Sequence, residues 1–289
     1  MNPETKPVMD KQALMQHLAA HGLQNYAQAA APFARQAITL TAVPAEAMAV
    51  GASRLGGEPD LPDDMAWPYA GDKPMALIAQ INFAEAKPFD ADNRLPESGI
   101  LYLFYEAEEQ PWGFDPKDKS GFQVAYYAGD NAALQRRTAP ADWAEYCRFS
   151  AAALRFGSRT ELPDSYSFLM RDYAMDDDEN DAWWYWRGEQ PEPFHKLLGH
   201  SDNIQGDMEL ECQLVSHGLY CGNSSGYEDP RRAELEAGAG DWVLLLQIDS
   251  EEAHCGMMWG DSGRLYLWIR QQDLAAKAFE RCWLVLQCY

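Results

Sequence analysis

Two stretches of the chain, LIAQIN at residues 77–82 and LLLQID at residues 244–249, place the same pattern of apolar residues around one glutamine. Each is followed at a similar distance by a second shared stretch, SGILYLF at residues 98–104 and SGRLYLW at residues 262–268. Short apolar and aromatic runs that begin after a Ser-Gly pair are typical of β-strands. The pattern therefore predicts a duplicated β-unit.

The similarity between the two copies extends upstream of these strands. LGGEPDLP at residues 55–62 loosely parallels LLGHSDNI at residues 197–204, after which the second copy has a longer insertion. Two copies are too few for a solenoid, whose units stack in longer arrays. We expect the copies to pack into one continuous core, and the line where they meet is the natural place for a cleft.

The remaining segments complete an α+β fold that is mainly β. Residues 10–31 carry apolar positions at helical spacing with Gly22 as a break, which predicts one or two helices, and residues 273–281 predict another, with Asp273 as its N-cap. Further strands are predicted at residues 37–43, 122–128 and 283–289. We expect the duplicated β-unit to form a roll or barrel-like sheet core with accessory helices.

The domain boundaries follow from these elements. Residues 1–50 form an N-terminal helical segment and a lead-in strand. Residues 51–289 form the main domain, whose two related β-units span about 51–130 and 195–289.

The charge balance limits the choice of partners. The chain has 45 acidic and 23 basic residues, for a formal net charge of -22. This charge repels phosphate backbones and anionic membranes, so we expect no nucleic-acid partner and no membrane partner. It suits solubility, and it would also steer a basic protein partner toward the surface.

The N-terminus and the cysteines indicate a cytoplasmic protein. The first residues, MNPETKPVMDKQALMQHL, include early acidic residues and no unbroken apolar run, so they do not form a secretory signal. No stretch is long and apolar enough to span a bilayer. We therefore expect six reduced thiols, several of them in the core: Cys147, Cys212, Cys221, Cys255, Cys282 and Cys288.

Two strings, AHC at residues 253–255 and GDSG at residues 260–263, resemble those of chymotrypsin-like proteases. In those enzymes the histidine lies far upstream of the serine, with the aspartate between them. Here His254 precedes Ser262 by only a few residues. The first repeat has Glu97-Ser98-Gly99 at the place of Asp261-Ser262-Gly263, so both strings are best explained as turns that enter a strand.

The ordered combination of short motifs is similar to the YwqG-like family of bacterial proteins, a domain of unknown function, from about Ser53 to the C-terminus. The motifs that carry the resemblance are GGEP (56–59), WP (67–68), QINF (80–83), LPESG (95–99), HKLLG (195–199), IQGD (204–207), LLLQID (244–249) and MWGD (258–261). The resemblance implies a mainly β roll with accessory helices and no catalytic assignment. It implies that Ser262 is not a nucleophile, and it suggests the company of bacterial toxin–immunity systems.

A run of acidic residues, Asp176, Asp177 and Asp178 with Glu179, precedes the aromatic cluster Trp183, Trp184, Tyr185 and Trp186. The run begins like an EF-hand loop but has neither the glycine at position six nor the glutamate at position twelve. We expect a solvated acidic loop followed by a half-buried strand. The alternative is a surface that binds a basic partner or a stacked ligand.

Two further candidates lie in the second half. His217 and Cys221 belong to a glycine-rich stretch, in which they could form a nucleophile pair, although a long surface turn is the favoured interpretation. Trp259 and Asp261 could lie at the mouth of a cleft between the β-units. The chain has no Cys-x-x-Cys pair, so the sequence predicts no metal site, and no motif predicts a cofactor.

These observations favour a cytosolic protein without catalytic activity. It would bind a basic protein, a toxin among the candidates, through an acidic and aromatic surface. The alternative is an enzyme or small-ligand binder that uses the cleft between the two β-units.

Overall fold

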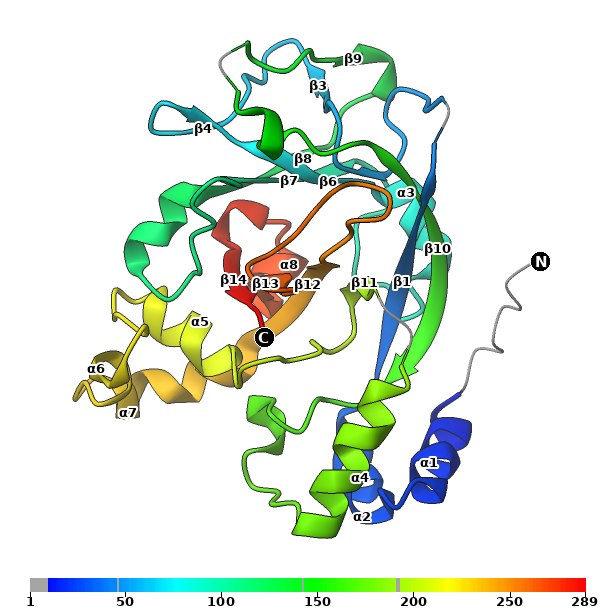
Figure 1. Ribbon diagram of the computed structural model, residues 1–289, viewed down its shortest axis with the longest axis vertical. Coiled ribbons are helices and arrows are strands. Elements are labelled where there is room, and N and C mark those ends of the chain that lie inside the picture. Colours follow the sequence, from blue (N-terminus) through cyan, green and yellow to red (C-terminus); the bar gives the residue numbers. More distant parts are fainter. Residues whose placement is uncertain (1–9, 46, 142, 191–192) are drawn as a thin grey trace.

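The structure, a computed structural model, describes residues 10–45, 47–141, 143–190 and 193–289. Its centre is a ten-stranded antiparallel sheet that is nearly closed into a barrel (Figure 1). The predicted class is confirmed, because the protein is mainly β with a barrel-like core and accessory helices.

Seven of the eight strands predicted from the sequence are present, and the structure adds three to the large sheet, β2, β10 and β11. The strands of this sheet are β1 (Arg35–Pro44), β2 (Arg54–Leu55), β6 (Ala76–Asn82), β7 (Ile100–Tyr105), β8 (Phe122–Tyr127), β10 (Ala152–Glu161), β11 (His195–Leu198), β12 (Trp242–Asp249), β13 (Arg264–Arg270) and β14 (Trp283–Gln287). They follow the order β14-β13-β12-β11-β1-β10-β2-β6-β7-β8. Two small ribbons pair β3 (Asp60–Pro62) with β9 (Leu134–Arg136), and β4 (Tyr69–Ala70) with β5 (Lys73–Pro74).

The helices are short. They are α1 (Lys11–Ala20), α2 (Gln24–Ala30), α3 (Phe83–Ala86), α4 (Asp177–Gly188), α5 (Glu209–Val215), α6 (Ser224–Tyr227), α7 (Arg232–Leu235) and α8 (Gln271–Ala275). Within the part of the chain that the structure describes, no helix has the length and apolar character needed to cross a membrane.

The helix predicted at residues 273–281 is corrected in its bounds. Helix α8 begins at Gln271 and ends at Ala275, because Lys277 adopts a positive φ of 58° that a helix does not accommodate. Asp273 is not an N-cap. Asp273 is the third residue of the helix, and its carboxylate pairs with Arg281 at 2.9 Å.

The predicted duplication is visible in the two hairpins β6–β7 and β12–β13. In both hairpins the register shifts at the same place, between Leu77 and Ala79 in the first and between Leu244 and Leu246 in the second. LIAQIN and LLLQID therefore share a β-bulge as well as a sequence pattern. A bulge increases the local twist of a strand, and this helps the sheet to coil.

The two halves of the sheet exchange their first strands. β1 pairs with β11 of the second half, and β10 pairs with β2 of the first half. β1 and β10 also pair with each other along their whole length, from Arg35 opposite Glu161 to Pro44 opposite Ala152. The lead-in strand that precedes the main β-units thus lies in the middle of the sheet. One hydrophobic cluster runs through both units, as the sequence predicts.

A buried glutamine and aspartate form the same contacts in each half. The Gln80 side chain accepts a hydrogen bond from the Asp60 N–H (2.8 Å) and donates to the Asp60 carboxylate (3.0 Å). Gln247 accepts from the Asp202 N–H (3.0 Å) and donates to the Asp202 carboxylate (2.8 Å). The loose parallel between LGGEPDLP and LLGHSDNI therefore reflects a shared structure.

A cation and a tyrosine complete each of these clusters. Arg54 pairs with the aspartate of the first half, and Lys196 pairs with that of the second half at 2.6 Å. The Tyr102 hydroxyl donates to the carbonyl of the first aspartate (2.5 Å), and the Tyr266 hydroxyl donates to that of the second (2.6 Å). Buried charges of this kind persist only when they are paired and hydrogen-bonded.

The seam of the barrel lies between the edge strands β8 and β14. The Leu286 N–H donates to the Trp112 carbonyl (2.9 Å), and the Trp283 indole donates to the Gly113 carbonyl (2.8 Å). A side chain at Gly113 would lie 2.1 Å from the Leu284 carbonyl, so this close approach requires glycine. Segment 112–114 thus covers an edge that would otherwise expose unpaired backbone groups.

The matched glutamines generate a stability prediction. Gln80→Leu and Gln247→Leu each leave buried backbone groups without a partner, so we expect each to lower the free energy of unfolding by about 2 kcal/mol or more. Gln123→Leu, at an exposed position of β8, should change it by less than about 0.5 kcal/mol. Chemical denaturation would measure these values. A two-step transition in either variant would show that the halves unfold independently, against the exchange of β1 and β10.

Candidate functional site

The acidic run and the aromatic cluster form one helix, α4. The predictions of a solvated loop at residues 176–181 and of a strand at Trp183, Trp184 and Trp186 are wrong. Asp176 is the N-cap and accepts a hydrogen bond from the Glu179 N–H at 2.9 Å. The carboxylates that follow it lie in the first turn, where the helix dipole stabilises negative charge.

Burial along α4 follows the period of a helix. Trp183 is buried against α1 and α2, and Trp186 packs against the same cluster one turn later. Trp184 is 42% exposed and Tyr185 is 68% exposed. In a strand, residues 183 and 185 would share a face. The four consecutive aromatic residues concealed this period, because they are apolar on every side.

The exposed side of α4 combines carboxylates and aromatic rings. Asp177, Asp178 and Asp181 are exposed on the first turns, and Trp184 and Tyr185 follow on the next turn. We call these five residues the acidic–aromatic face. Tyr166, which is 43% exposed, extends the face by packing against Trp184 at 6.2 Å between ring centroids. Large exposed aromatic side chains of this kind are typical of protein interfaces.

Buried polar contacts hold α4 in place. The Glu179 carboxylate accepts hydrogen bonds from the Tyr26 N–H (2.8 Å) and the Tyr173 hydroxyl (2.6 Å), and thereby caps the start of α2. Arg187 pairs with Asp164 at 2.7 Å, and burial raises the pKa of the Asp164 carboxyl to about 6. The acidic–aromatic face is therefore presented on a fixed support.

His217 and Cys221 do not form a nucleophile pair. His217 is exposed, and its Nδ1 donates to the Gln213 carbonyl at 2.6 Å. Cys221 is buried, and its thiol points to the Leu219 carbonyl at 3.7 Å. Burial raises the pKa of the Cys221 thiol to about 12, so it stays protonated and is a weak nucleophile at neutral pH.

Trp259 lies in the core instead of at the mouth of a cleft. It is fully buried, packs against Tyr105 and Phe149, and donates to the Asp249 carbonyl at 3.3 Å. Asp261 is exposed in the turn that precedes β13, where its carbonyl accepts the Tyr289 N–H at 3.2 Å. The structure therefore separates these two sequence neighbours, one into the core and one into solvent.

The histidine of the AHC string contacts a glutamate instead of Ser262. The Glu251 carboxylate accepts hydrogen bonds from His254 (2.9 Å) and His195 (3.1 Å). The Asp249 N–H donates to Nδ1 of His195, so the other ring nitrogen carries the proton. Burial raises the pKa of Glu251, but the two histidine hydrogen bonds outweigh this effect and lower it. This trio, in which His195 and Glu251 are buried, joins β11 to the loop before β13.

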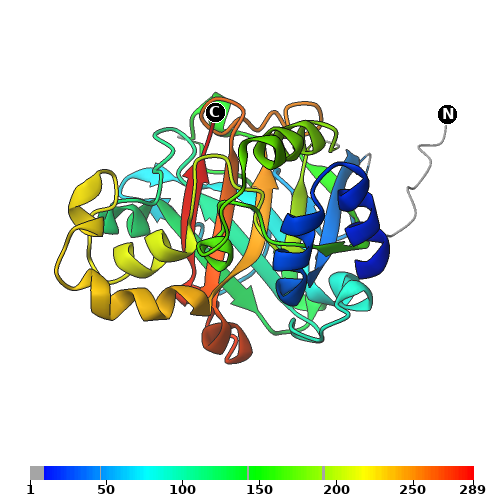
Figure 2. The same cartoon turned by 90° about the horizontal axis from the view of Figure 1, so that it is seen from below.

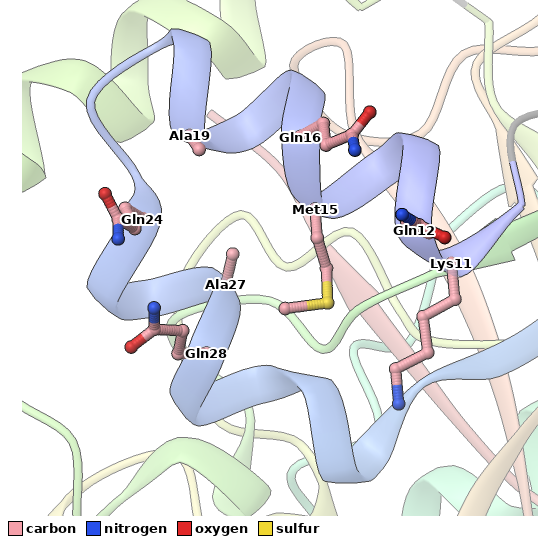
Figure 3. A pocket seen from close by; sticks show the side chains of 8 residues that line it. All are labelled: Lys11, Gln12, Met15, Gln16, Ala19, Gln24, Ala27 and Gln28. Atoms are coloured by element: carbon pink, nitrogen blue, oxygen red, sulfur yellow. The ribbon is translucent and has the colours of Figure 1, made fainter.

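A shallow groove of about 620 Å³ lies along α1 and α2 (Figure 3). Met15 reaches from α1 toward α2, while the glutamines Gln16, Gln24 and Gln28 lie at its margins. Lys11 is the one charged side chain among the eight residues that line it. These residues supply no acid–base pair or metal ligand set.

A second, smaller pocket contains titratable groups. It has a volume of about 280 Å³ and lies where segment 112–114 of the first half meets β14 and α5 of the second half. Asp207 and Glu211 line it beside Trp112, Phe114 and Tyr227. The sequence analysis missed these residues because they come from four separate segments with no common motif.

The burial pattern of α4 can be tested by two matched substitutions. We expect Trp183→Ala to lower the free energy of unfolding by about 3–5 kcal/mol, because it empties a packed site. Tyr185→Ala should change it by less than about 0.5 kcal/mol, because the ring is exposed. Chemical denaturation measures both. Equal losses would contradict the helix and would fit a strand that buries both residues.

The family of the chain follows from a comparison with known proteins. Residues 53–288 match the family described as a domain of unknown function, DUF1963. No protein of the curated collection matches the chain. The family match spans both hairpins, both buried glutamine–aspartate clusters, helix α4 and the pocket, while β1 precedes it. On the strength of this match the chain belongs to the DUF1963 family of domains of unknown function.

Proposed function

We propose that this protein acts without catalysis, by binding a basic protein through the acidic–aromatic face of α4. The observation that carries the proposal is the combination on one helix of exposed carboxylates and exposed aromatic rings. Carboxylates steer and orient a basic partner, while Trp and Tyr supply most of the binding energy in a typical interface. Neither feature alone would distinguish this face from an ordinary solvated helix.

The charge of the chain supports the same function. A net charge of -22 attracts basic partners from a distance and speeds their encounter. Arg187, whose guanidinium lies 5.5 Å from the Trp184 ring centroid, shows that this ring already accepts a cation in the free protein. A lysine or arginine of the partner could approach the same rings from the solvent side.

The resemblance to the YwqG-like family adds a biological context to the proposal. Under this assignment the protein works in the cytoplasm, and the company of toxin–immunity systems favours a basic toxin as the partner. The product of the gene beside this one is the first partner to test by co-purification.

One observation favours the competing function, an enzyme or small-ligand binder with a cleft between the two β-units. The pocket beside Asp207 and Glu211 lies at such a junction. It does not include Trp259, Asp261 or Cys221 among the residues that line it.

The proposed surface can be tested with a fluorescently labelled hexa-arginine peptide, whose binding is followed by anisotropy at low and high salt. A triple variant, Asp177→Asn with Asp178→Asn and Asp181→Asn, removes the carboxylates of the face. We expect it to bind the peptide about tenfold more weakly than the unmodified protein at low salt. Trp184→Ala should reduce the part of the binding that persists at high salt, because that part does not depend on long-range charge.

The control is a second triple variant with the same change in net charge. It combines Asp64→Asn, Asp72→Asn and Glu252→Gln, three exposed positions away from α4. We expect this control to lose less than about a third of the affinity that the α4 variant loses. Equal losses of affinity in the two variants would mean that peptide binding depends only on the net charge of the protein, and the proposed face would be rejected.

A further inference from the structure

Hydrogen bonds fix the backbone around the pocket that lies between segment 112–114, β14 and α5. The Gln287 side chain accepts the N–H groups of Ile204 (2.9 Å) and Gln205 (3.0 Å) and donates to the Gly206 carbonyl (3.3 Å). This fixes the loop that leads into α5 against the edge strand. The loop that lines the pocket is therefore tied to the barrel.

Aromatic rings form one side of the pocket. Trp112 is 36% exposed and lies 6.3 Å from the Phe114 ring, and Phe114 packs edge-on against Tyr220 at 5.7 Å. The Phe114 carbonyl accepts the Cys221 N–H at 2.8 Å, which fixes the backbone of this wall. Aromatic faces attract cations through their quadrupole.

Two carboxyl groups that have no counter-charge form the other side. Asp207 accepts the N–H groups of Glu209 (2.8 Å) and Leu210 (3.2 Å) and so begins α5, and Glu211 accepts the Tyr227 hydroxyl (3.2 Å). Among the residues that the structure describes, neither Asp207 nor Glu211 has an ion-pair partner.

Other carboxylates of the protein differ from Asp207 and Glu211 because they have a counter-charge. The carboxylates of Asp60, Asp202 and Asp249 each pair with a cation of the same chain, namely Arg54, Lys196 and Arg264. Asp207 and Glu211 have no such cation in the described part of the chain, and they line an open volume of about 280 Å³. A cation from outside the chain could pair with them as Arg54, Lys196 and Arg264 pair with those three carboxylates.

The titration of the two carboxyl groups agrees with a missing cation. Burial, and then the nearby Glu209 carboxylate, raise the pKa of Asp207 to about 8. Burial raises the pKa of Glu211 to about 7, the Tyr227 hydrogen bond works against this rise, and Asp118 adds to it. A raised carboxyl pKa means that the ionised form is destabilised in this environment, and a bound cation removes that penalty.

We propose that this pocket binds the cationic end of a small ligand, an alkylguanidinium or alkylammonium group. Asp207 and Glu211 would pair with the charge, while Trp112 and Phe114 would cover the alkyl stem and the cation face. The group can come from a free amine or guanidine, or from a lysine or arginine side chain of a protein. The same contacts serve both sources.

This proposal stands independently of the acidic–aromatic face. Helix α4 lies with α1 and α2 at one side of the barrel, while α5, α6 and α7 lie at the other side, as both views show (Figures 1 and 2). Either surface can be inactive while the other binds its ligand.

The test uses calorimetry on the full chain at pH 9 with n-butylguanidinium and n-butylammonium, and with the neutral n-butylurea as control. We expect both cations to bind and the urea not to bind. Glu211→Gln keeps an acceptor for Tyr227, and Asp207→Asn keeps an acceptor for the Glu209 and Leu210 N–H groups, so both variants should fold. Each should weaken cation binding about tenfold or more. Glu234→Gln, an exposed position on α7, should leave it unchanged.

The pH dependence gives a second readout that a structural role of these residues would not produce. Both carboxyl groups are protonated below their raised pKa values and ionised above them. Cation binding should therefore strengthen as the pH rises from 6 to 9, with uptake of the cation releasing protons. Glu209, Asp118, Tyr227 and Cys221 also face these groups, and Glu211→Gln should reduce the slope without removing the part due to Asp207.

The outcomes separate the possibilities. Equal binding of the urea and the cations would identify an apolar pocket and overturn the proposal, as would a lack of binding at pH 9. Binding of the free cations supports it, and the two sources then differ in one measurement. If a dipeptide with a blocked N-terminus and an arginine side chain binds at least as tightly as n-butylguanidinium, the source is a protein side chain; weaker binding identifies a free amine or guanidine.

Discussion

The pairing of β1 with β10 is the constraint on which the rest of this structure depends. β1 is the first strand of the first half but pairs with β11, the second strand of the second half. β10 is the first strand of the second half but pairs with β2, the second strand of the first half. Neither half can therefore complete its sheet alone. Because the pairs join residues more than a hundred positions apart, the loop-closure entropy is recovered only when the whole barrel assembles. One continuous core is the consequence.

The buried glutamine–aspartate clusters fix the geometry on both sides of this central pair. Gln80 and Gln247 lie in the third large-sheet strand of their halves and reach the backbone of the segment that follows the second one. An unpaired amide or carboxylate at these positions would cost more than the bond contributes, so the clusters act against alternative registers. The two halves differ in the cation, Arg54 in one and Lys196 in the other, yet they keep the same arrangement.

Both candidate surfaces arise where the second half departs from the symmetry of the first. Helix α4 is inserted between β10 and β11, whereas a short connection joins β1 to β2. Helices α5, α6 and α7 are inserted between β11 and β12, and α5 forms one side of the pocket. The duplicated strands thus provide a rigid support, and the insertions carry the groups that are free to contact another molecule.

The hairpins, the N-terminal helical segment and the turns could be predicted from the sequence, because these features depend on residues that are close along the chain. The shared LIAQIN and LLLQID patterns predict β6 and β12, and the structure adds that both strands bulge at the same place. The turn predicted at Asp261-Ser262-Gly263 is present, and Ser262 has the positive φ of 51° that a turn residue can adopt. Local chemistry suffices for these features.

Three features depend on contacts that form in the folded chain: the exchange of β1 and β10, the helical state of residues 177–188 and the position of the pocket. Strand β10 is half-buried along most of its length and mixes small and charged residues, so its sequence carries no clean alternation. Both its neighbours come from distant parts of the chain. Helix α4 is set by the burial of Trp183 against α1 and α2 and by the cap that Glu179 provides to α2. Asp207 and Trp112 meet only when β14 closes the barrel. These contacts join residues far apart in sequence, and no local pattern encodes them.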